Sequence, residues 1–271
     1  MKIWAHTIVN NEENFIWFAL MSVVDHVDKV LIYDTGSTDK TVEIIKEIKK
    51  LKGNRAASYG SRIEFREVGL VDKFQFPKIR QKMLDESRCD WILILDGDEI
   101  WWEESIKKMV KLINQKGDEI EGIVVPFIVP VGDIYHLQED MAGRYQLLGK
   151  KGHYSLRAFN KKIPGLHVDW PYGKEGFFDA DKRLIQERKD IIFLDAPFLH
   201  LTHLKRSSLK RSYEKFKYEL GNKVREGYKY PEVLYQKYPS FIPSPWIKIS
   251  GIKKIKSQLL TPLRKLKRRL V

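Results

Sequence analysis

The chain has 271 residues, of which 43% are hydrophobic and 31% charged, with 17 glycines and 11 prolines. This composition is typical of a globular protein and excludes wholesale disorder and collagen-like repeats. The single cysteine, Cys89, excludes a disulfide framework and a cysteine-rich zinc site, and it fits a reducing compartment such as the cytoplasm. No apolar run approaches the roughly 20 residues that span a bilayer. We therefore expect neither a signal peptide nor a membrane-spanning helix.

The positive charge is concentrated at the C-terminal end. The net charge is +13, and residues 246–271 contain nine basic and no acidic residues. The residues before them therefore have a net charge of only +4. A nucleic-acid-binding protein more often spreads such charge over its folded surface. We expect the tail to bind an anionic surface rather than a nucleic acid.

Apolar and amphipathic segments alternate regularly over the first 130 residues. They predict strands at 2–9, 29–33, 62–68, 91–95 and 122–129, and helices at 12–27, 40–51, 76–87 and 103–115. Ser37 or Thr38 is expected to cap the second of these helices. This alternation predicts an α/β fold with a Rossmann-like, mostly parallel sheet that helices cover on both faces. Ligands in such folds bind beyond the carboxyl ends of the strands.

The pattern loosens after residue 130. Two strands are predicted at 154–159 and 191–194, and a charged helix at 207–226 precedes a segment rich in tyrosine and proline. These changes divide the chain into a main domain, an extension and a tail. The main domain is expected at 1–205, with a regular half at about 1–130 and an irregular half at about 131–205, followed by the extension at 206–245 and the tail at 246–271.

The tail has the spacing of an amphipathic helix. Its apolar residues recur in steps of three and four at Ile252, Ile255, Leu259, Leu263, Leu266 and Leu270, with basic residues elsewhere. Pro262 is expected to kink this helix, and Trp246 before it suits a membrane interface. The pattern predicts a helix on an anionic membrane surface, where each basic residue contributes about 1 kcal/mol. Alternatively, the apolar face packs on the body or binds a partner protein. A further alternative is that the basic residues of the tail bind a nucleic acid.

Two carboxylates follow the predicted buried strand at 91–95. Successive side chains of an extended chain point to opposite sides, so Asp96 and Asp98 are expected to point to the same side. Gly97 between them is expected to leave room for a ligand. Two carboxylates so close repel unless a cation joins them. Mg²⁺ or Mn²⁺ accepts oxygen ligands and shares its shell with phosphates, so the pattern predicts a metal site for a diphosphate. The alternative is a polar turn in which Asp98 or Glu99 caps the next helix.

Three segments in this order resemble glycosyltransferase family 2, which has the GT-A fold. They are Ile-Val-Asn-Asn-Glu-Glu at 8–13, Val-Leu-Ile-Tyr-Asp-Thr-Gly-Ser-Thr-Asp-Lys-Thr at 30–41, and Trp-Ile-Leu-Ile-Leu-Asp-Gly-Asp-Glu at 91–99. The segment 76–81 also resembles the Arg-Asn helix start of the family, with Gln81 where Asn is usual. The resemblance covers about residues 2–130, which would form the donor-binding half, whereas 131–205 would form the acceptor half.

The resemblance implies an inverting transferase that uses a nucleotide-diphosphate sugar, such as a UDP- or GDP-sugar, together with Mg²⁺ or Mn²⁺. An acceptor hydroxyl on a glycan or a lipid-linked acceptor would attack the sugar while a carboxylate removes its proton. The implied contacts are Asn11 and Glu12 in the base pocket, Asp34 at the base or ribose, Arg80 at the nucleotide or its phosphates, and Asp96 and Asp98 at the metal. Such an enzyme would suit glycan or polysaccharide assembly on the cytoplasmic face of a membrane.

The catalytic base is expected in the irregular half, where the candidates are Asp140, Asp169, Glu175 and Asp179. Residues 157–160 resemble a strand that precedes the loop of the base in related sequences, and 172–176 resemble that loop. This favours Glu175 as the base, with Lys174 where His is usual, and Asp169 as the second choice.

A late histidine often completes the metal site in GT-A enzymes. His203 is the first candidate for a metal ligand or phosphate contact, and His200 the second, although each is alternatively a core histidine. The aromatic residues Trp101, Trp102, Trp170 and Tyr172 are candidates for stacking on sugar faces, although aromatic residues more often lie in the core.

Two other functions compete with the transferase. An apolar strand ending in Asp-x-Asp also describes an aspartate-nucleophile phosphatase of the haloacid dehalogenase type, but that class has the motif on its first strand. A catalytically inactive protein that binds nucleotide, or a membrane-associated scaffold, is the non-enzymatic alternative.

Overall fold

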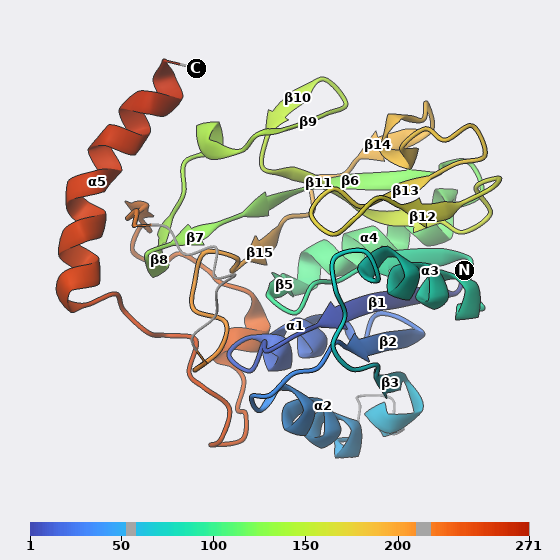
Figure 1. The fold of residues 1–271 in the computed structure, drawn as a ribbon, viewed down its shortest axis with the longest axis horizontal. Coiled ribbons are helices and arrows are strands. Elements are labelled where there is room, and N and C mark those ends of the chain that lie inside the picture. Colours follow the sequence, from blue (N-terminus) through green and yellow to red (C-terminus); the bar gives the residue numbers. More distant parts are fainter. Residues whose placement is uncertain (53–57, 210–217, 271) are drawn as a thin grey trace.

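The computed structural model describes residues 1–52, 58–209 and 218–270. Within these residues, a nine-stranded sheet forms the centre of the molecule in the order β3-β2-β1-β4-β11-β6-β15-β5, with β14 beside β6 (Figure 1). The strands are β1 (Ile3–Val9), β2 (Lys29–Asp34), β3 (Ile63–Glu67), β4 (Trp91–Ile94), β5 (Glu99–Trp101), β6 (Gly122–Ile128), β11 (Tyr154–Asn160), β14 (Ile191–Phe193) and β15 (Phe198–His200).

The sheet is mostly parallel, which confirms the predicted fold class. Strand β1 pairs in parallel with β2 and β4, and β2 pairs in parallel with β3, whereas β11 runs antiparallel between β4 and β6. The register aligns Val9 with Asp34, and the backbone N–H of Leu95 donates to the carbonyl of His6 over 3.0 Å. The segments that follow β1, β2 and β4 therefore leave the sheet at the same edge.

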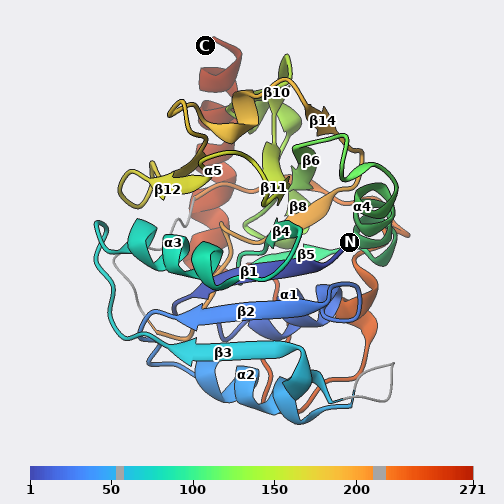
Figure 2. The ribbon, with the colours of Figure 1, turned by 90° about the vertical axis from the view of Figure 1, so that its right-hand side faces the viewer.

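Helices cover both faces of the sheet, as predicted (Figures 1 and 2). Helices α1 (Ile16–Val23), α2 (Thr41–Lys50) and α4 (Glu103–Lys116) share one hydrophobic cluster with β1 and β2. Helix α3 (Phe76–Glu86) and the hairpin of β12 (His167–Asp169) and β13 (Gly176–Phe178) cover the other face. The predicted bounds hold closely, except that α1 is shorter than the segment 12–27.

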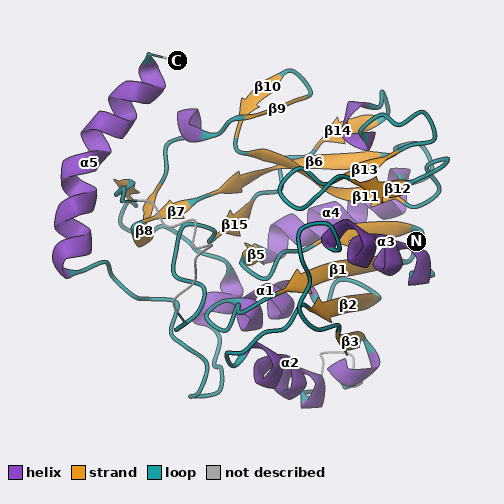
Figure 3. Ribbon diagram, in the orientation of Figure 1, coloured by secondary structure: helices purple, strands orange, loops and turns teal. Residues whose placement is uncertain are grey.

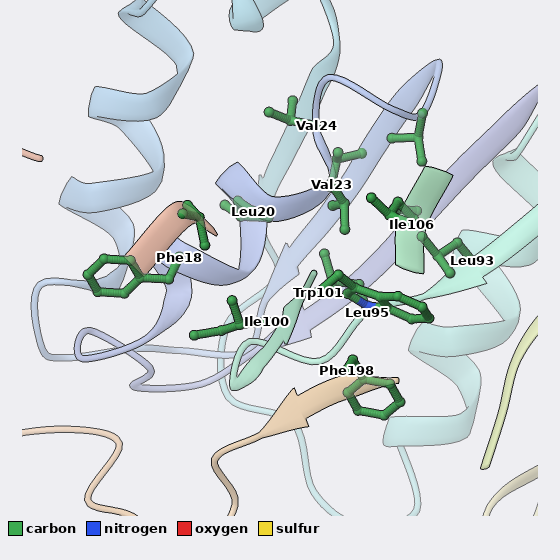
Figure 4. Close-up of a cluster of buried hydrophobic side chains, with 14 of the residues drawn as sticks. Phe18, Leu20, Val23, Val24, Leu93, Leu95, Ile100, Trp101, Ile106 and Phe198 are labelled. Atoms are coloured by element: carbon green, nitrogen blue, oxygen red, sulfur yellow. The ribbon is translucent and has the colours of Figure 1, made fainter. Parts of the chain in front are cut away.

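Strand β5 is held by the core and was not predicted. Trp101 is 1% exposed, and its ring stacks on that of Phe198 with centroids 5.1 Å apart (Figure 4). Phe18 and Leu20 of α1 and Ile106 of α4 belong to the same cluster. The acidic turn at 96–99 therefore lies between two buried strands, β4 and β5, which restrict its position.

Loops and short strands make up most of the second half (Figure 3). They include β7 (Pro130–Val131), β8 (Asp133–Leu137), β9 (Tyr145–Leu147), β10 (Lys150–Gly152) and β16 (Asn222–Lys223). The prediction of a helix at 207–226 is wrong for its described part: residues 210–217 lie outside the described residues, and residues 218–226 contain β16 instead. The chain here pairs with β8 instead, and Gly221 permits the close approach, because a Cβ there would lie 2.3 Å from the carbonyl oxygen of Leu137.

The basic tail forms helix α5 (Gly251–Arg269), which stands at the edge of the molecule (Figures 1 and 2). Polar contacts attach one face of α5 to the body: Leu220 N donates to Thr261 Oγ1 over 2.7 Å, and Lys265 Nζ donates to Asn222 Oδ1 over 2.7 Å. Arg268 pairs with Glu139 and with the buried Glu219. The helix continues through Pro262.

The apolar face of α5 is exposed. The six residues predicted to form its stripe are between 56% and 77% exposed: Ile252, Ile255, Leu259, Leu263, Leu266 and Leu270. The alternative in which this stripe packs on the body is therefore wrong. Among the described helices, none combines the length and the apolar character that crossing a membrane requires.

Candidate active site

Asp34 lies at the carboxyl end of β2 and is 2% exposed. Its Oδ2 accepts hydrogen bonds from Gly36 N over 3.0 Å and from Ser37 N over 2.9 Å. Gly36 has a φ of +83°, a conformation that favours glycine and lets the chain turn back over the carboxylate. The other oxygen, Oδ1, is buried and has no hydrogen-bond partner among the described residues. A buried acceptor of this kind is suited to a ligand that donates.

Asn11 joins the loop after β1 to the loop after β2. Its Oδ1 accepts hydrogen bonds from Thr38 N over 2.6 Å and from Asp39 N over 3.1 Å, and its own N–H donates to Ser37 Oγ over 2.7 Å. Its φ of +54° is one that asparagine adopts more readily than most residues. The predicted cap of α2 by Ser37 or Thr38 is wrong, because Asp39 Oδ1 accepts from Thr41 N instead.

Glu12 lies beside the acidic turn. Its carboxylate is 2.7 Å from Arg206 Nη1, and Arg206 Nη1 is 3.9 Å from Asp98 Oδ2. A Cβ on Gly97 would lie 2.9 Å from Glu12 Cγ. The space beside Gly97 is therefore filled by Glu12, and the expectation that Gly97 leaves room for a ligand is wrong. No motif in the sequence marks Arg206, which only the folded chain brings to this site.

The acidic turn places its carboxylates at different depths. The side chain of Asp96 is 39% exposed, whereas those of Asp98 and Glu99 are 4% and 0% exposed. Arg157 of β11 contacts Glu99 and lies 3.5 Å from Asp96 Oδ2. His200, at the end of β15, has its Nε2 3.6 Å from Asp98 Oδ1 and 3.9 Å from Glu99 Oε1. Asp96 is thus the carboxylate of the turn that is open to solvent.

Asp96, Glu99 and His200 form a candidate metal group, because each offers a ligand atom within 4.8 Å of the others. In the part of the chain that the structure describes, this group includes His200 rather than His203. His203 is buried, and its predicted role stays a prediction. Glu99, Arg157 and His200 come together only through the pairing of β5, β6, β11 and β15, so spacing along the chain did not predict the group.

Burial and charge act in opposite directions in this group. Burial raises the pKa of Glu99 to about 8, and Asp96 adds to this shift while Arg157 opposes it. Burial lowers the pKa of His200, but the charges of Asp98 and Glu99 outweigh it, so the net shift is upward. Excess negative charge here favours a cation, whether the protonated imidazole or a bound metal ion.

Helix α3 connects the site to the β12–β13 hairpin. The guanidinium of Arg80 lies 5.2 Å from the ring centroid of Phe76 and 5.8 Å from that of Phe177 in β13. Gln81 Oε1 accepts a hydrogen bond from Val168 N of β12 over 2.7 Å. The glutamine that replaces the usual asparagine thus joins the two elements, and a nucleotide contact of Arg80 stays a prediction.

The candidate bases lie in different environments. Asp169 and Glu175 flank the exposed loop of the hairpin: Asp169 Oδ1 accepts from Trp170 N over 2.7 Å, and the carboxylate of Glu175 accepts from Gly173 N. Asp179 is 1% exposed and forms an ion pair with Arg188 over 2.6 Å, which indicates a structural role. Asp140 lies on the surface in the short helix Asp140–Ala142. The catalytic roles of Glu175 and Asp169 stay predictions.

Comparisons with known proteins identify relatives of most of the chain, including the acidic turn but not His200 or Arg206. The model of the family "Glycosyl transferase family 2" matches residues 5–184. The chain is 28% identical over 169 residues to the SPbeta prophage-derived glycosyltransferase SunS of Bacillus subtilis, a match that covers 58% of this chain and 35% of SunS. It is 32% identical over 124 residues to an uncharacterized glycosyltransferase of Rickettsia felis, covering 45% of this chain and 34% of that protein. The chain thus spans about a third of the length of these curated relatives.

The fold is shared with solved glycosyltransferases. The structure of S. aureus TarS residues 1–349 in complex with UDP-GlcNAc is 16% identical, with a TM-score of 0.50, and the match covers 99% of this chain and 72% of that one. This similarity concerns the fold and confirms the GT-A architecture that the sequence predicted. Since the family model covers both the acidic turn and the strand ends around it, the chain belongs to glycosyltransferase family 2.

Proposed function

We propose that this protein is a metal-dependent, inverting glycosyltransferase that moves a sugar from a nucleoside-diphosphate donor to an acceptor hydroxyl. The observation that carries the proposal is the convergence, at one edge of the sheet, of a buried carboxylate with the candidate metal group. Asp34 has a buried Oδ1 without a partner among the described residues, and Asp96 is the exposed member of the group of Asp96, Glu99 and His200. Family membership argues against the phosphatase alternative.

The donor nucleotide would lie over the ends of β1 and β2. Asp34 would accept a hydrogen bond from the base or ribose through its Oδ1. Asn11 and Glu12 would line the base pocket, and Arg80 would approach the nucleotide or its phosphates. Arg206 adds a cation beside Asp98, where it would face the diphosphate. A UDP- or GDP-sugar fits these contacts, and UDP is the first probe because it is the nucleotide of the TarS complex.

Mg²⁺ or Mn²⁺ fits the residues of the acidic turn. Two carboxylates and an imidazole supply oxygen and nitrogen ligands, a set that suits Mn²⁺ in particular. Asp96 and Asp98 are the carboxylate ligands that the resemblance implies, and Glu99 joins Asp96 in the candidate group. The contacts of His200 support it as the histidine ligand in place of His203. The ion would supply positive charge for the departing diphosphate. Arg157 would orient Asp96 and Glu99 through its ion pairs with both.

Glu175 is the proposed catalytic base, and Asp169 the alternative. Each lies at one end of the loop between β12 and β13 and is accessible to an acceptor. The carboxylate would take the proton from the acceptor hydroxyl as the oxygen attacks the anomeric carbon from the face opposite the leaving diphosphate. Attack from that face inverts the anomeric centre.

The proposed acceptor is a glycan or a lipid-linked molecule at the cytoplasmic face of a membrane. Helix α5 supports peripheral attachment, because its apolar stripe is exposed while its polar face is attached to the body. The basic residues of the tail would interact with anionic lipid headgroups. The enzyme would then act in glycan, glycolipid or polysaccharide assembly.

The proposal is tested by screening UDP- and GDP-sugars with Mn²⁺ or Mg²⁺ for thermal stabilisation, followed by an assay of nucleotide-diphosphate release and sugar transfer. We expect one donor to raise the melting temperature only when the metal is present. The variants D34N and D96A should lose this shift, whereas D140N, which changes an exposed carboxylate outside the proposed donor contacts, should retain it. Transfer that survives in D96A and D98A would exclude the metal mechanism. Binding without turnover for every donor and acceptor would instead support the inactive scaffold.

A further inference from the structure

The loop between β12 and β13 exposes two large aromatic side chains. Trp170 is 49% exposed and Tyr172 is 53% exposed. Phe74, in the segment before α3, is 60% exposed and belongs to the stretch that holds this loop. Large apolar side chains exposed together usually mark a binding surface. We call Phe74, Trp170 and Tyr172 the aromatic platform.

The backbone of the loop holds Trp170 in an unfavourable conformation. Its φ is +71°, in the left-handed region that a bulky side chain rarely adopts. The ring nevertheless packs edge-on against Phe178, with centroids 4.8 Å apart, and the backbone N–H of Trp170 donates to Asp169 Oδ1 over 2.7 Å. Strained residues that the surrounding structure fixes in this way cluster at ligand sites.

Hydrogen bonds and a ring contact attach the loop of the aromatic platform to helix α3 and the segment before it. Tyr172 N donates to the carbonyl oxygen of Lys73 over 2.8 Å, and the Tyr172 ring packs edge-on against Phe76 with centroids 4.7 Å apart. Val168 N, in β12, is bound by Gln81 of α3. The aromatic platform therefore has a fixed place relative to α3, which also carries Arg80.

The platform borders the acidic turn. Burial raises the pKa of Tyr172, and the charges of Arg206, Asp96 and Asp98 also act on its phenol, so the side chain lies within electrostatic range of the acidic turn. Glu175, at the end of the same loop, also acts on the phenol. The platform and the proposed base Glu175 therefore belong to one loop, which contacts helix α3 and the segment before it.

We propose that Trp170 and Tyr172, with Phe74 beside them, form the acceptor subsite and bind the apolar face of a sugar ring. This inference rests on the proposed transferase function and assigns the acceptor class as carbohydrate. Sugar rings present C–H groups on one face and hydroxyls around the edge, so they require aromatic rings with polar groups next to them. The loop has this composition, since Asp169 precedes Trp170, and Lys174 and Glu175 follow Tyr172. A lipid chain or an apolar peptide would require a continuous apolar groove instead.

The test compares an aromatic and an aliphatic replacement of the same ring. The full-length protein, wild type and the variants W170F and W170L, is applied to a printed glycan array with and without UDP and Mn²⁺. We expect wild type to bind a related set of glycans, W170F to stay within about threefold of it, and W170L to lose about tenfold or more. UDP affinity, measured by calorimetry with Mn²⁺, should be equal in all three proteins, which controls for folding and for the donor site.

The outcomes separate the inference from the proposed function. If wild type binds UDP but no glycan, or if W170L binds glycans as well as W170F does, the aromatic platform is not a sugar site. If glycans bind with the expected order but neither UDP nor GDP binds, the carbohydrate site stands and the proposed donor chemistry fails. Preferential binding to a peptide array, unaffected by the W170L change, would also overturn the inference.

Discussion

Arg206 Nη1 lies 2.7 Å from Glu12 Oε1, although 194 residues separate the two along the chain. Glu12 is 5% exposed, and the Arg206 side chain is 22% exposed. The pair joins the loop after β1, at the proposed base pocket, to the segment that follows β15. Because Arg206 also lies 3.9 Å from Asp98, its guanidinium would contribute both to folding and, under the proposed function, to the binding of the diphosphate.

The first prediction separates these two contributions. R206M removes the cation opposite a buried carboxylate, so we expect the free energy of unfolding to fall by about 1–3 kcal/mol. The affinity for UDP with Mn²⁺ should fall about tenfold, because a charge-assisted contact to the diphosphate is lost. Urea unfolding and calorimetry measure the two quantities. In the double variant E12Q/R206M the stability should largely return while UDP affinity stays low; recovery of both would show that Arg206 is only structural.

The second prediction distinguishes the two late histidines. His200 Nε2 faces Asp98 and Glu99, so H200Q should abolish the Mn²⁺-dependent increase in melting temperature or weaken Mn²⁺ affinity by about 10–100-fold. H203Q, three residues along the same segment, is the matched control and should change Mn²⁺ affinity by less than about threefold. Titration of each variant with Mn²⁺ measures this. Loss of the metal in H203Q alone would restore the ligand that the sequence pattern favoured.

Most of the sheet was predictable because its strands are buried runs bounded by turns. The segments 29–33 and 91–95 match β2 and β4 within a residue, since apolar periodicity records burial directly. Strand β5 was missed because three residues give no period, and only packing of Trp101 on Phe198 holds them in a strand. The composition of the segment 207–226 predicts a helix. In the fold, the backbone at Gly221 lies close to β8, and the next two residues pair with that strand.

The site was predictable where it depends on strand ends. Asp34 and Asp96 follow predicted strands, and parallel pairing brings such ends together. Arg157 and Arg206 were not assigned to the acidic turn, and His200 was only the second choice after His203, because their contacts with the turn arise from antiparallel pairing and a late loop. The spacing of residues along the chain does not predict such contacts. Gly97 shows the same limit, since its neighbour is Glu12, 85 positions away.

The third prediction concerns stability at acidic pH. Burial lowers the pKa of His6 to about 3, with smaller contributions from Arg80 and Lys161, and its Nε2 lies 2.6 Å from Ser87 Oγ. The ordinary pKa is 6.5, so between pH 6.5 and 3 the unfolded state binds a proton that the folded state does not. The free energy of unfolding should therefore fall on acidification, by about 2 kcal/mol from this group between pH 7 and 5.

The variant H6Q isolates this contribution. Glutamine keeps a polar group near Ser87 but does not titrate, so other groups should produce the same pH dependence in both proteins. Urea unfolding of wild type and H6Q at pH 7 and pH 5 gives the difference. An equal loss of stability in the two proteins would show that His6 is protonated in the folded state.

The fourth prediction tests attachment through α5. Leu259 and Leu263 are 69% and 64% exposed, so L259S/L263S should leave the free energy of unfolding within about 0.5 kcal/mol of wild type. Binding to vesicles of phosphatidylcholine with 30% phosphatidylserine should weaken at least about tenfold, because each leucine contributes about 1.5–3 kcal/mol when buried in the interface. Co-sedimentation measures the binding.

The control L70S removes a leucine that is 86% exposed and lies outside α5, and it should bind as wild type does. Wild-type binding should also weaken with added salt, since the basic residues of the tail supply part of the attraction. Vesicle binding that L259S/L263S does not reduce would show that the exposed stripe has another partner.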